Sequence, residues 1–189
     1  MSLSALLQNI ADAEQGPKTC AVFDFDGTII SGYSATAFLK DQIARGEISP
    51  ADLVQLTQAA TRFGIGSLGF SALMAVHAQY LAGRSEADYV ANSERLFRKA
   101  IAKLIYPEAR QLIEAHRTAG HSIAIISSAT PYQVLPAARD LGIEHVYATD
   151  LEVEDGQFTG GVVQPTCFGI GKVHAAERFT PQQGSDLEN

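Results

Sequence analysis

Segments with strand and helix patterns alternate along the second half of the chain, and this alternation limits the fold more than any other feature of the sequence. Residues 107–120 have a helical pattern that ends at a glycine, and the short apolar run at 121–128 has the pattern of a buried strand. Another helix is expected at 131–142, followed by a strand at 145–150. A further buried strand is expected near the start of the chain, at 18–23. Strands and helices in this order form a parallel sheet with helices on both faces, so we predict a three-layer α/β fold.

The remaining segments predict helices and one hairpin. An amphipathic helix is expected in the first 15 residues, and Asp155-Gly156 is a strong turn signal within a hairpin at 151–163. A last helix is expected at 171–179, and the interior Pro136 should kink or restart the helix that contains it. Four more helices are expected between the first strand and Tyr106, with starts near Ser34, Ser49, Phe70 and Ser85 and the last one reaching Leu104. These four would form an inserted bundle.

The composition is that of a compact globular protein with one substantial core. Its 189 residues are 46% hydrophobic and 19% charged, and the formal net charge is −7. This charge argues against nucleic acid as a partner, although a local basic pocket for a small phosphate stays open. Cys20 and Cys167 do not form a metal-ligand pattern or a disulfide framework, which fits a reducing cytoplasm. No apolar run is long enough for a membrane span, and the oligomeric state is left open.

The segment AVFDFDGTII places two aspartates, Asp24 and Asp26, at the end of the first apolar run. An ionised carboxylate near a core loses hydration unless a cation or hydrogen bonds replace it. Two carboxylates on one face of a strand would also repel each other, so a bend after Asp24 is expected. Gly27 suits this bend because glycine adopts backbone angles that other residues avoid, and Thr28 can then bond locally. An ordinary acidic turn at the end of a strand is the alternative interpretation.

Two further groups suit an anion. Ser127 ends the apolar run at 121–128 and precedes Ser128, so hydroxyl and N–H groups meet where a strand gives way to a helix. Lys172 stands at a helix start, where a cation is unfavourable to the helix dipole and is better explained by an anionic neighbour. Each signal alone has an ordinary explanation, a helix cap or a solvated lysine. Together with the acid pair, they favour a phosphate site at the carboxyl ends of the strands.

In these motifs the sequence resembles the haloacid dehalogenase-like phosphohydrolases, in particular the phosphoserine-phosphatase-like branch, subfamily IB. DFDGT at 24–28 is similar to the first motif of the family, IISS at 125–128 to the second, and GKV around Lys172 to the third. The resemblance implies a Rossmann-like core formed by residues 1–30 and 107–189, with an inserted α-helical bundle cap at 31–106.

The resemblance also implies roles for individual residues. Asp24 would be the nucleophile that forms an aspartyl-phosphate, and Asp26 would protonate the leaving group and then activate water. Mg²⁺ would bind the Asp24 carboxylate and the Asp26 backbone carbonyl, since hard oxygens suit this ion. The phosphate-binding residues would be Ser127, Ser128, Lys172, Gly27 and Thr28. The expected activity is Mg²⁺-dependent hydrolysis of a small phosphorylated metabolite.

Departures from the pattern leave the substrate and the activity of this chain open. Phosphoserine phosphatases carry a substrate-binding glutamate where this chain has Tyr33, and the third helix of the bundle lacks their arginine, so serine phosphate is disfavoured. The family's fourth motif, an acidic pair, has no match before Asn189, which predicts a truncated form with weak Mg²⁺ affinity. Two alternatives stay open. One is a phosphotransferase; the other is a weakly active or regulatory domain from the front of a longer protein, such as a lipid acyltransferase fusion.

Overall fold

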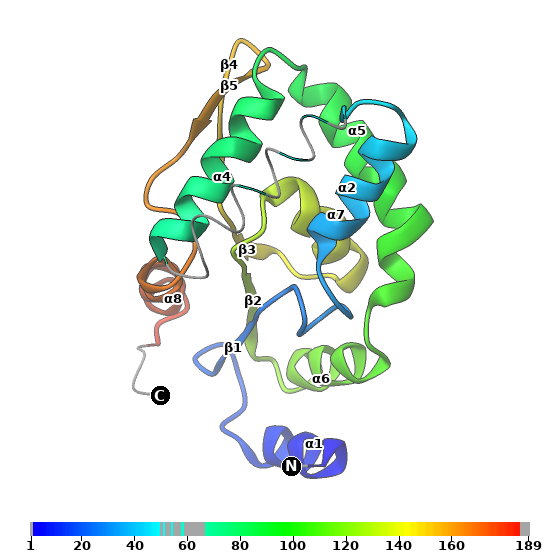
Figure 1. Ribbon diagram of the computed structural model, residues 1–189. Helices are drawn as coiled ribbons and strands as arrows, with labels where there is room; N and C mark the ends of the chain where they lie inside the picture. The colour runs from blue at the N-terminus through cyan, green and yellow to red at the C-terminus, as the bar shows by residue number, and fades with distance from the viewer. Residues whose placement is uncertain (1, 50, 52–53, 55–57, 59–66, 186–189) are drawn as a thin grey trace.

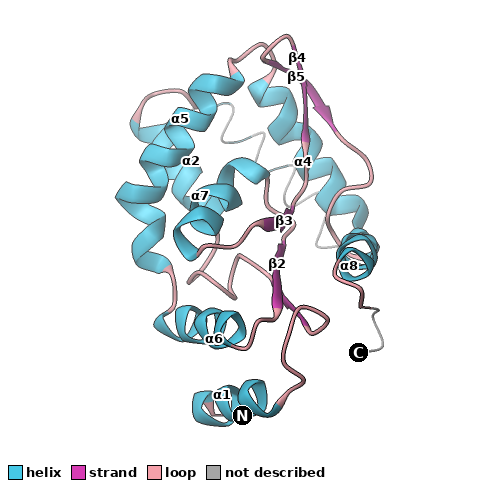
Figure 2. Cartoon of the chain, turned by 180° about the vertical axis from the view of Figure 1, so that it is seen from behind, coloured by secondary structure: helices cyan, strands magenta, loops and turns pink. Residues whose placement is uncertain are grey.

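The computed structural model describes residues 2–49, 51, 54, 58 and 67–185. Three parallel strands in the order β1-β2-β3 form its main sheet: β1 (Cys20–Phe23), β2 (Ser122–Ile126) and β3 (His145–Tyr147). Two helices, α6 (Pro107–Thr118) and α7 (Pro131–Leu141), lie on one side of the sheet, and α8 (Ile170–Gln182) lies on the other (Figure 2). The predicted three-layer α/β fold is therefore confirmed. The register pairs Phe23 with Ile125, so β1 and β2 end at the same edge.

Local sequence signals explain where α7 begins and ends. Thr130 is its N-cap, Pro131 occupies its first turn, and Gly142 ends it in the left-handed conformation at φ 64°. Pro136 does not restart the helix, which runs unbroken through this residue. The helix stays continuous because it packs on the core through buried side chains, which include Val134, Ala137, Ala138 and Leu141.

Three helices lie beyond the carboxyl ends of the strands: α2 (Ser34–Ala44), α4 (Ser67–Leu81) and α5 (Glu86–Leu96) (Figure 1). The helix predicted to start at Ser49 falls largely outside the described residues. The last predicted helix of this group is shorter than expected, because α5 gives way to a π-helix at Phe97–Ile101 and a 3₁₀ turn at Ala102–Leu104. The change of pitch lets Phe97 and Ile101 both reach the core, where they are 6% and 1% exposed.

The predicted amphipathic helix near the N-terminus is present as α1 (Leu3–Asp12), which packs against α6. Its N-cap Ser2 accepts a hydrogen bond from the Ala5 N–H.

The predicted hairpin is also present, as β4 (Leu151–Glu154) and β5 (Gln157–Val162). Asp155 and Gly156 both have positive φ, 51° and 73°, as a two-residue hairpin turn requires. The hairpin lies along α4 and pairs with neither edge of the parallel sheet (Figure 1). The backbone of Phe158 makes two hydrogen bonds to the loop between α4 and α5. Its carbonyl accepts from the Gly83 N–H at 2.8 Å, and its N–H donates to the Arg84 carbonyl at 3.0 Å.

No helix among the described residues is long and apolar enough to cross a membrane.

One partly buried histidine predicts a pH dependence of stability. Burial lowers the pKa of His77, on α4, from 6.5 to about 4. Between these two values the unfolded chain binds a proton that the folded chain excludes, so stability falls as the pH falls from 6.5 toward 4. We expect the parent protein to lose about 1–2 kcal/mol more unfolding free energy between pH 7 and pH 5 than His77→Gln.

Denaturant unfolding at several pH values measures this difference. The control is His174→Gln: the side chain is 53% exposed and pairs with Glu177 at the surface, so its loss should change the pH dependence of stability by less than the loss of His77. Identical pH dependence in the parent and His77→Gln would contradict the prediction.

Candidate active site

The turn after β1 holds the first acid in a fixed orientation. Asp24 follows the strand directly, and its Oδ1 accepts a hydrogen bond of 2.7 Å from the Phe25 N–H. Phe25 is fully buried, and its carbonyl accepts hydrogen bonds from Thr28, Ile29 and Ile30. The chain therefore bends sharply after Asp24, as the acid pair predicted.

Gly27 makes this bend possible. Its φ is 74°, in the left-handed region that favours glycine, and its N–H donates to the Gly32 carbonyl at 2.9 Å. The Thr28 N–H also forms a hydrogen bond within the turn, since it donates to the Phe25 carbonyl at 3.3 Å. Thr28 as a whole is exposed to solvent.

Lys172 contacts Asp24 directly. Its Nζ lies 2.8 Å from Asp24 Oδ2, and the two side chains are 31% and 42% exposed. Lys172 stands in the first turn of α8, where the helix dipole disfavours a cation. The anionic neighbour expected from the sequence is thus present, and a lysine ammonium and a carboxylate meet at the carboxyl edge of the sheet.

Asp26 lies deeper and is held by α2. Its two oxygens accept hydrogen bonds from the Ser34 N–H at 2.7 Å and the Ser34 hydroxyl at 3.2 Å. The Gln133 side chain donates to the Ser34 hydroxyl at 3.0 Å and accepts from the Thr130 N–H and hydroxyl. This polar chain, Asp26–Ser34–Gln133–Thr130, connects the acid to the starts of both α2 and α7.

The sequence did not indicate that Ser34 and Gln133 belong to this polar chain of side chains. The available signal was the capping-box spacing of Thr130 and Gln133. That spacing predicts a helix start, but it does not identify a contact with an acid on another segment.

Burial governs the protonation of Asp26. Desolvation raises its pKa above the ordinary value of 3.8, the hydrogen bonds from Ser34 lower it, Asp24 raises it and Lys172 lowers it, with a net upward shift. The two acids therefore differ in environment, since Asp24 pairs with a cation and Asp26 is desolvated.

Ser127 follows the neighbouring strand and is 1% exposed. Its hydroxyl accepts from the Ala129 N–H at 3.2 Å, and its own N–H donates to the Tyr147 carbonyl at 2.9 Å. Because Phe23 pairs with Ile125, Asp24 and Ser127 both leave the sheet at its carboxyl edge. Ser128 lies next to Ser127 and is partly exposed.

The loop before α8 sets the position of Lys172. Thr149 follows β3, and its hydroxyl accepts a hydrogen bond from the Cys167 N–H at 3.1 Å. The Thr149 N–H donates to the Ala129 carbonyl, so Thr149 joins the loop before α8 to the loop after β2. Gly171 is buried, and a Cβ at this position would lie 1.9 Å from the Thr166 carbonyl oxygen. Only glycine fits where the loop and the first turn of α8 meet.

Cys167 lies close enough to the candidate active site for the charges of Lys172 and Asp24 to shift the pKa of its thiol. Burial raises the pKa of the Cys167 thiol, Lys172 lowers it and Asp24 raises it. Across the described residues, histidine, cysteine, aspartate and glutamate side chains form no group of three or more that could hold a metal ion. The metal ligands expected from the sequence, the Asp24 carboxylate and the Asp26 backbone carbonyl, both belong to the turn after β1.

Comparisons with known proteins agree with this geometry. The family model described as haloacid dehalogenase-like hydrolase matches residues 21–189. The chain belongs to this family. A phosphoserine phosphatase of Mycobacterium tuberculosis is 33% identical over 173 residues, which cover 89% of this chain and 56% of that protein. The chain spans 38–61% of the length of the mycobacterial relatives it matches.

Two solved structures show the same fold. A protein of unknown function from Bordetella pertussis matches with a TM-score of 0.78 at 24% identity, covering 91% of this chain and 78% of that one. A phosphoserine phosphatase structure described as a phospho-aspartyl intermediate analogue matches with a TM-score of 0.63 at 20% identity, covering 91% and 75%. The predicted family and core fold are confirmed.

Gly171→Ala tests how the start of α8 is positioned. The added methyl group would meet a backbone oxygen that cannot move aside as a side chain can, so the loop or the helix must shift. We expect a loss of about 1–3 kcal/mol in unfolding free energy, measured by denaturant titration. Val173→Ala is the control, since Val173 is 43% exposed and its truncation should change stability by about 0.5 kcal/mol or less. Equal stability of Gly171→Ala and the parent would refute this account of the loop.

Proposed function

We propose that the protein hydrolyses a small phosphomonoester through a phosphoenzyme formed on Asp24. The contact between the Asp24 carboxylate and the Lys172 ammonium at 2.8 Å carries this proposal. It places a nucleophile beside a cation that can stabilise phosphoryl oxygens, at the sheet edge where such sites form.

The chemistry assigns different work to the two acids. An Asp24 oxygen attacks phosphorus as the bond from phosphorus to the ester oxygen breaks, and Asp26 gives its proton to the departing alkoxide. Asp26, now ionised, then takes a proton from the water that attacks the aspartyl-phosphate, which releases phosphate and restores both acids. Its raised pKa supports this assignment, since a desolvated carboxyl group holds its proton at a higher pH than an exposed one.

The phosphoryl oxygens would be held by Lys172, by Ser127 and by hydroxyl or N–H groups of Ser128. Gly27 and Thr28 would contribute through the turn that they form and through the Thr28 hydroxyl, because both of their N–H groups donate within the turn. These roles rest on position at the carboxyl edge and on the chemistry of the donors.

The oxygen donors of the first turn fit Mg²⁺, which takes one or two carboxylates and keeps several water molecules. The Asp24 carboxylate and the Asp26 backbone carbonyl would hold it. When bound there, Mg²⁺ would offset the negative charge of the phosphoryl group.

We further propose that residues 1–30 and 107–189 form the core and that residues 31–106 form a cap over the site. The substrate is a small phosphorylated metabolite other than serine phosphate, because Tyr33 is 70% exposed at the start of α2 and provides no carboxylate for an amino group. A phosphotransferase is the second candidate, because an alcohol can replace water in the second step.

Asp24→Asn and Asp26→Asn test the mechanism on a panel of phosphomonoesters with Mg²⁺. Asp24→Asn should lower kcat by about a thousandfold or more, because it removes the nucleophile. Asp26→Asn should be similarly slow and should accumulate phosphoenzyme, which intact-protein mass spectrometry detects. The control Asp12→Asn changes an exposed acid at the end of α1 and should keep the parent's rate. Parent-like turnover in Asp24→Asn would exclude the mechanism, and a phosphorylated product with added glycerol would indicate transfer.

A further inference from the structure

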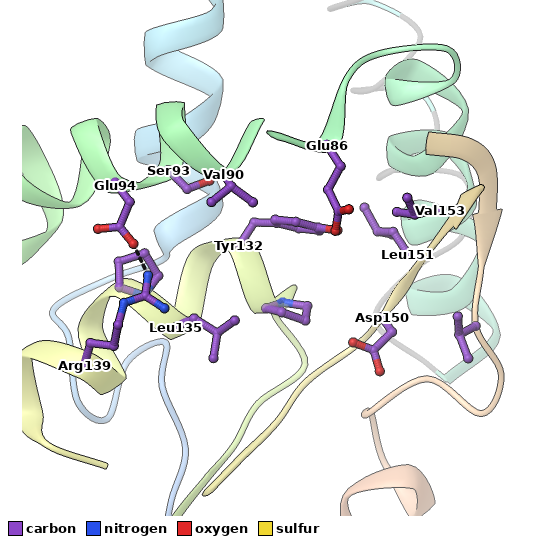
Figure 3. A pocket seen from close by; sticks show the side chains of 13 residues that line it. Glu86, Val90, Ser93, Glu94, Tyr132, Leu135, Arg139, Asp150, Leu151 and Val153 are labelled. Atoms are coloured by element: carbon purple, nitrogen blue, oxygen red, sulfur yellow. Dashed lines mark hydrogen bonds and ion pairs between the residues drawn. The ribbon is translucent and has the colours of Figure 1, made fainter. Parts of the chain in front are cut away.

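A second cavity lies between α5, α7 and the strand β4, apart from the candidate active site (Figure 3). Its volume is about 450 Å³, within the range of cavities that bind small molecules. None of the residues placed in the candidate active site lines it. We call this cavity the α5–α7 cleft.

Apolar side chains on the walls of the α5–α7 cleft are unusually exposed. Val90 is 42% exposed, Leu135 37% and Val163 43%, and all three line the cleft. On α5 the side chains of Tyr89 and Leu96 are buried, whereas Val90 lies on the exposed side of the helix that lines the cleft. Exposed apolar side chains gathered around one hollow indicate a binding surface, because burial against a ligand would stabilise them.

The polar groups of the cleft are distributed unevenly. Glu94 and Arg139 form an ion pair at one end, so the guanidinium there is already occupied (Figure 3). Glu86, the Tyr132 hydroxyl and Asp150 lie at the other end (Figure 3). The Tyr132 hydroxyl donates to Glu86 Oε1 at 2.7 Å, which leaves the second oxygen of Glu86 to accept another donor.

Asp150 is the more exposed of the two acids at this end. Within the described parts of the chain, no hydrogen bond or ion pair reaches its carboxylate, although the charge of Arg178 acts on it from a greater distance. Asp150 is exposed to solvent, and a carboxylate beside apolar walls attracts a cation through a charge-assisted hydrogen bond. An anion placed here would face both Glu86 and Asp150 and would be repelled.

We propose that the α5–α7 cleft binds a small organic cation, a primary ammonium group carried on a short apolar chain. The ammonium donates to the carboxylates of Asp150 and Glu86, and the apolar chain packs against Val90, Leu135 and Val163. The ligand contacts α5 and α7 together, so binding strengthens the pairing that the Glu94–Arg139 and Glu86–Tyr132 contacts already make.

The ligand would also act near the candidate active site. Helix α7 starts at Thr130, which bonds Gln133 in the polar chain that reaches Asp26. A ligand that holds α7 against α5 therefore fixes the helix whose first turn supports this acid.

Titration of the ¹⁵N-labelled protein with hexylammonium chloride, followed by amide chemical shifts, tests the proposal. Hexanol and sodium hexanoate have the same apolar chain and serve as neutral and anionic probes. We expect saturable shifts at residues 86–96 and 131–139 with hexylammonium, weaker binding of hexanol, and none of hexanoate. Equal binding of the three probes, or shifts confined to the turn at 24–28, would overturn the proposal.

The variant Asp150→Asn provides a second test of the proposal, because it keeps the shape of the side chain and removes its charge. We expect its affinity for hexylammonium to fall at least about tenfold, since a hydrogen bond to a charged group is lost. Glu144→Gln is the matched control: this exposed acid lies shortly before β3 and does not line the cleft. An unchanged affinity in Asp150→Asn, with a spectrum that shows the parent fold, would also reject the proposal.

Discussion

The ion pair between Asp24 and Lys172 joins the end of the first strand to the start of the last helix. Each group is stabilised by the other, since Asp24 follows an apolar strand and Lys172 opposes the dipole of α8. Each compensates the other, and the two segments that meet here come from opposite ends of the chain. The tight packing at Gly171 and the bonds between Thr149 and Cys167 then fix the approach of α8. The proposed site for an anion would result from the same contacts that close the fold.

Asp26 shows how one turn can give two carboxylates different properties. The acids are separated by a single residue, yet Phe25 is buried between them and directs the chain so that each finds a different partner. Asp24 meets a cation near solvent, whereas Asp26 meets neutral donors in a desolvated position. Such separation of environments would let two equal groups act as nucleophile and general acid in the proposed reaction.

Much of the fold could be predicted from the sequence because its signals are local. The strand at 121–128, the helix at 131–142 and the turn at Asp155-Gly156 each depend on residues within a few positions. The contact of Lys172 with an acid could be inferred because a cation at a helix start requires an explanation. The bonds of Ser34 to Asp26 and Gln133 could not, because they depend on how α2 and α7 pack together. The π-helix after α5 was missed for the same reason, since tertiary packing of Phe97 and Ile101 overrides the regular helical repeat.

The hairpin β4–β5 has a consequence for how the molecule can move. It follows β3 in the chain but is bonded to the loop between α4 and α5, through Phe158, Gly83 and Arg84. The Gln79 side chain adds a bond to the Gly160 carbonyl. A rotation of α4 and α5 relative to the sheet must therefore carry the hairpin with it or break these bonds. The rotating body would be assembled from two separate stretches of chain, so its hinges would include the short connections on either side of the hairpin as well as those at 31–33 and 102–106.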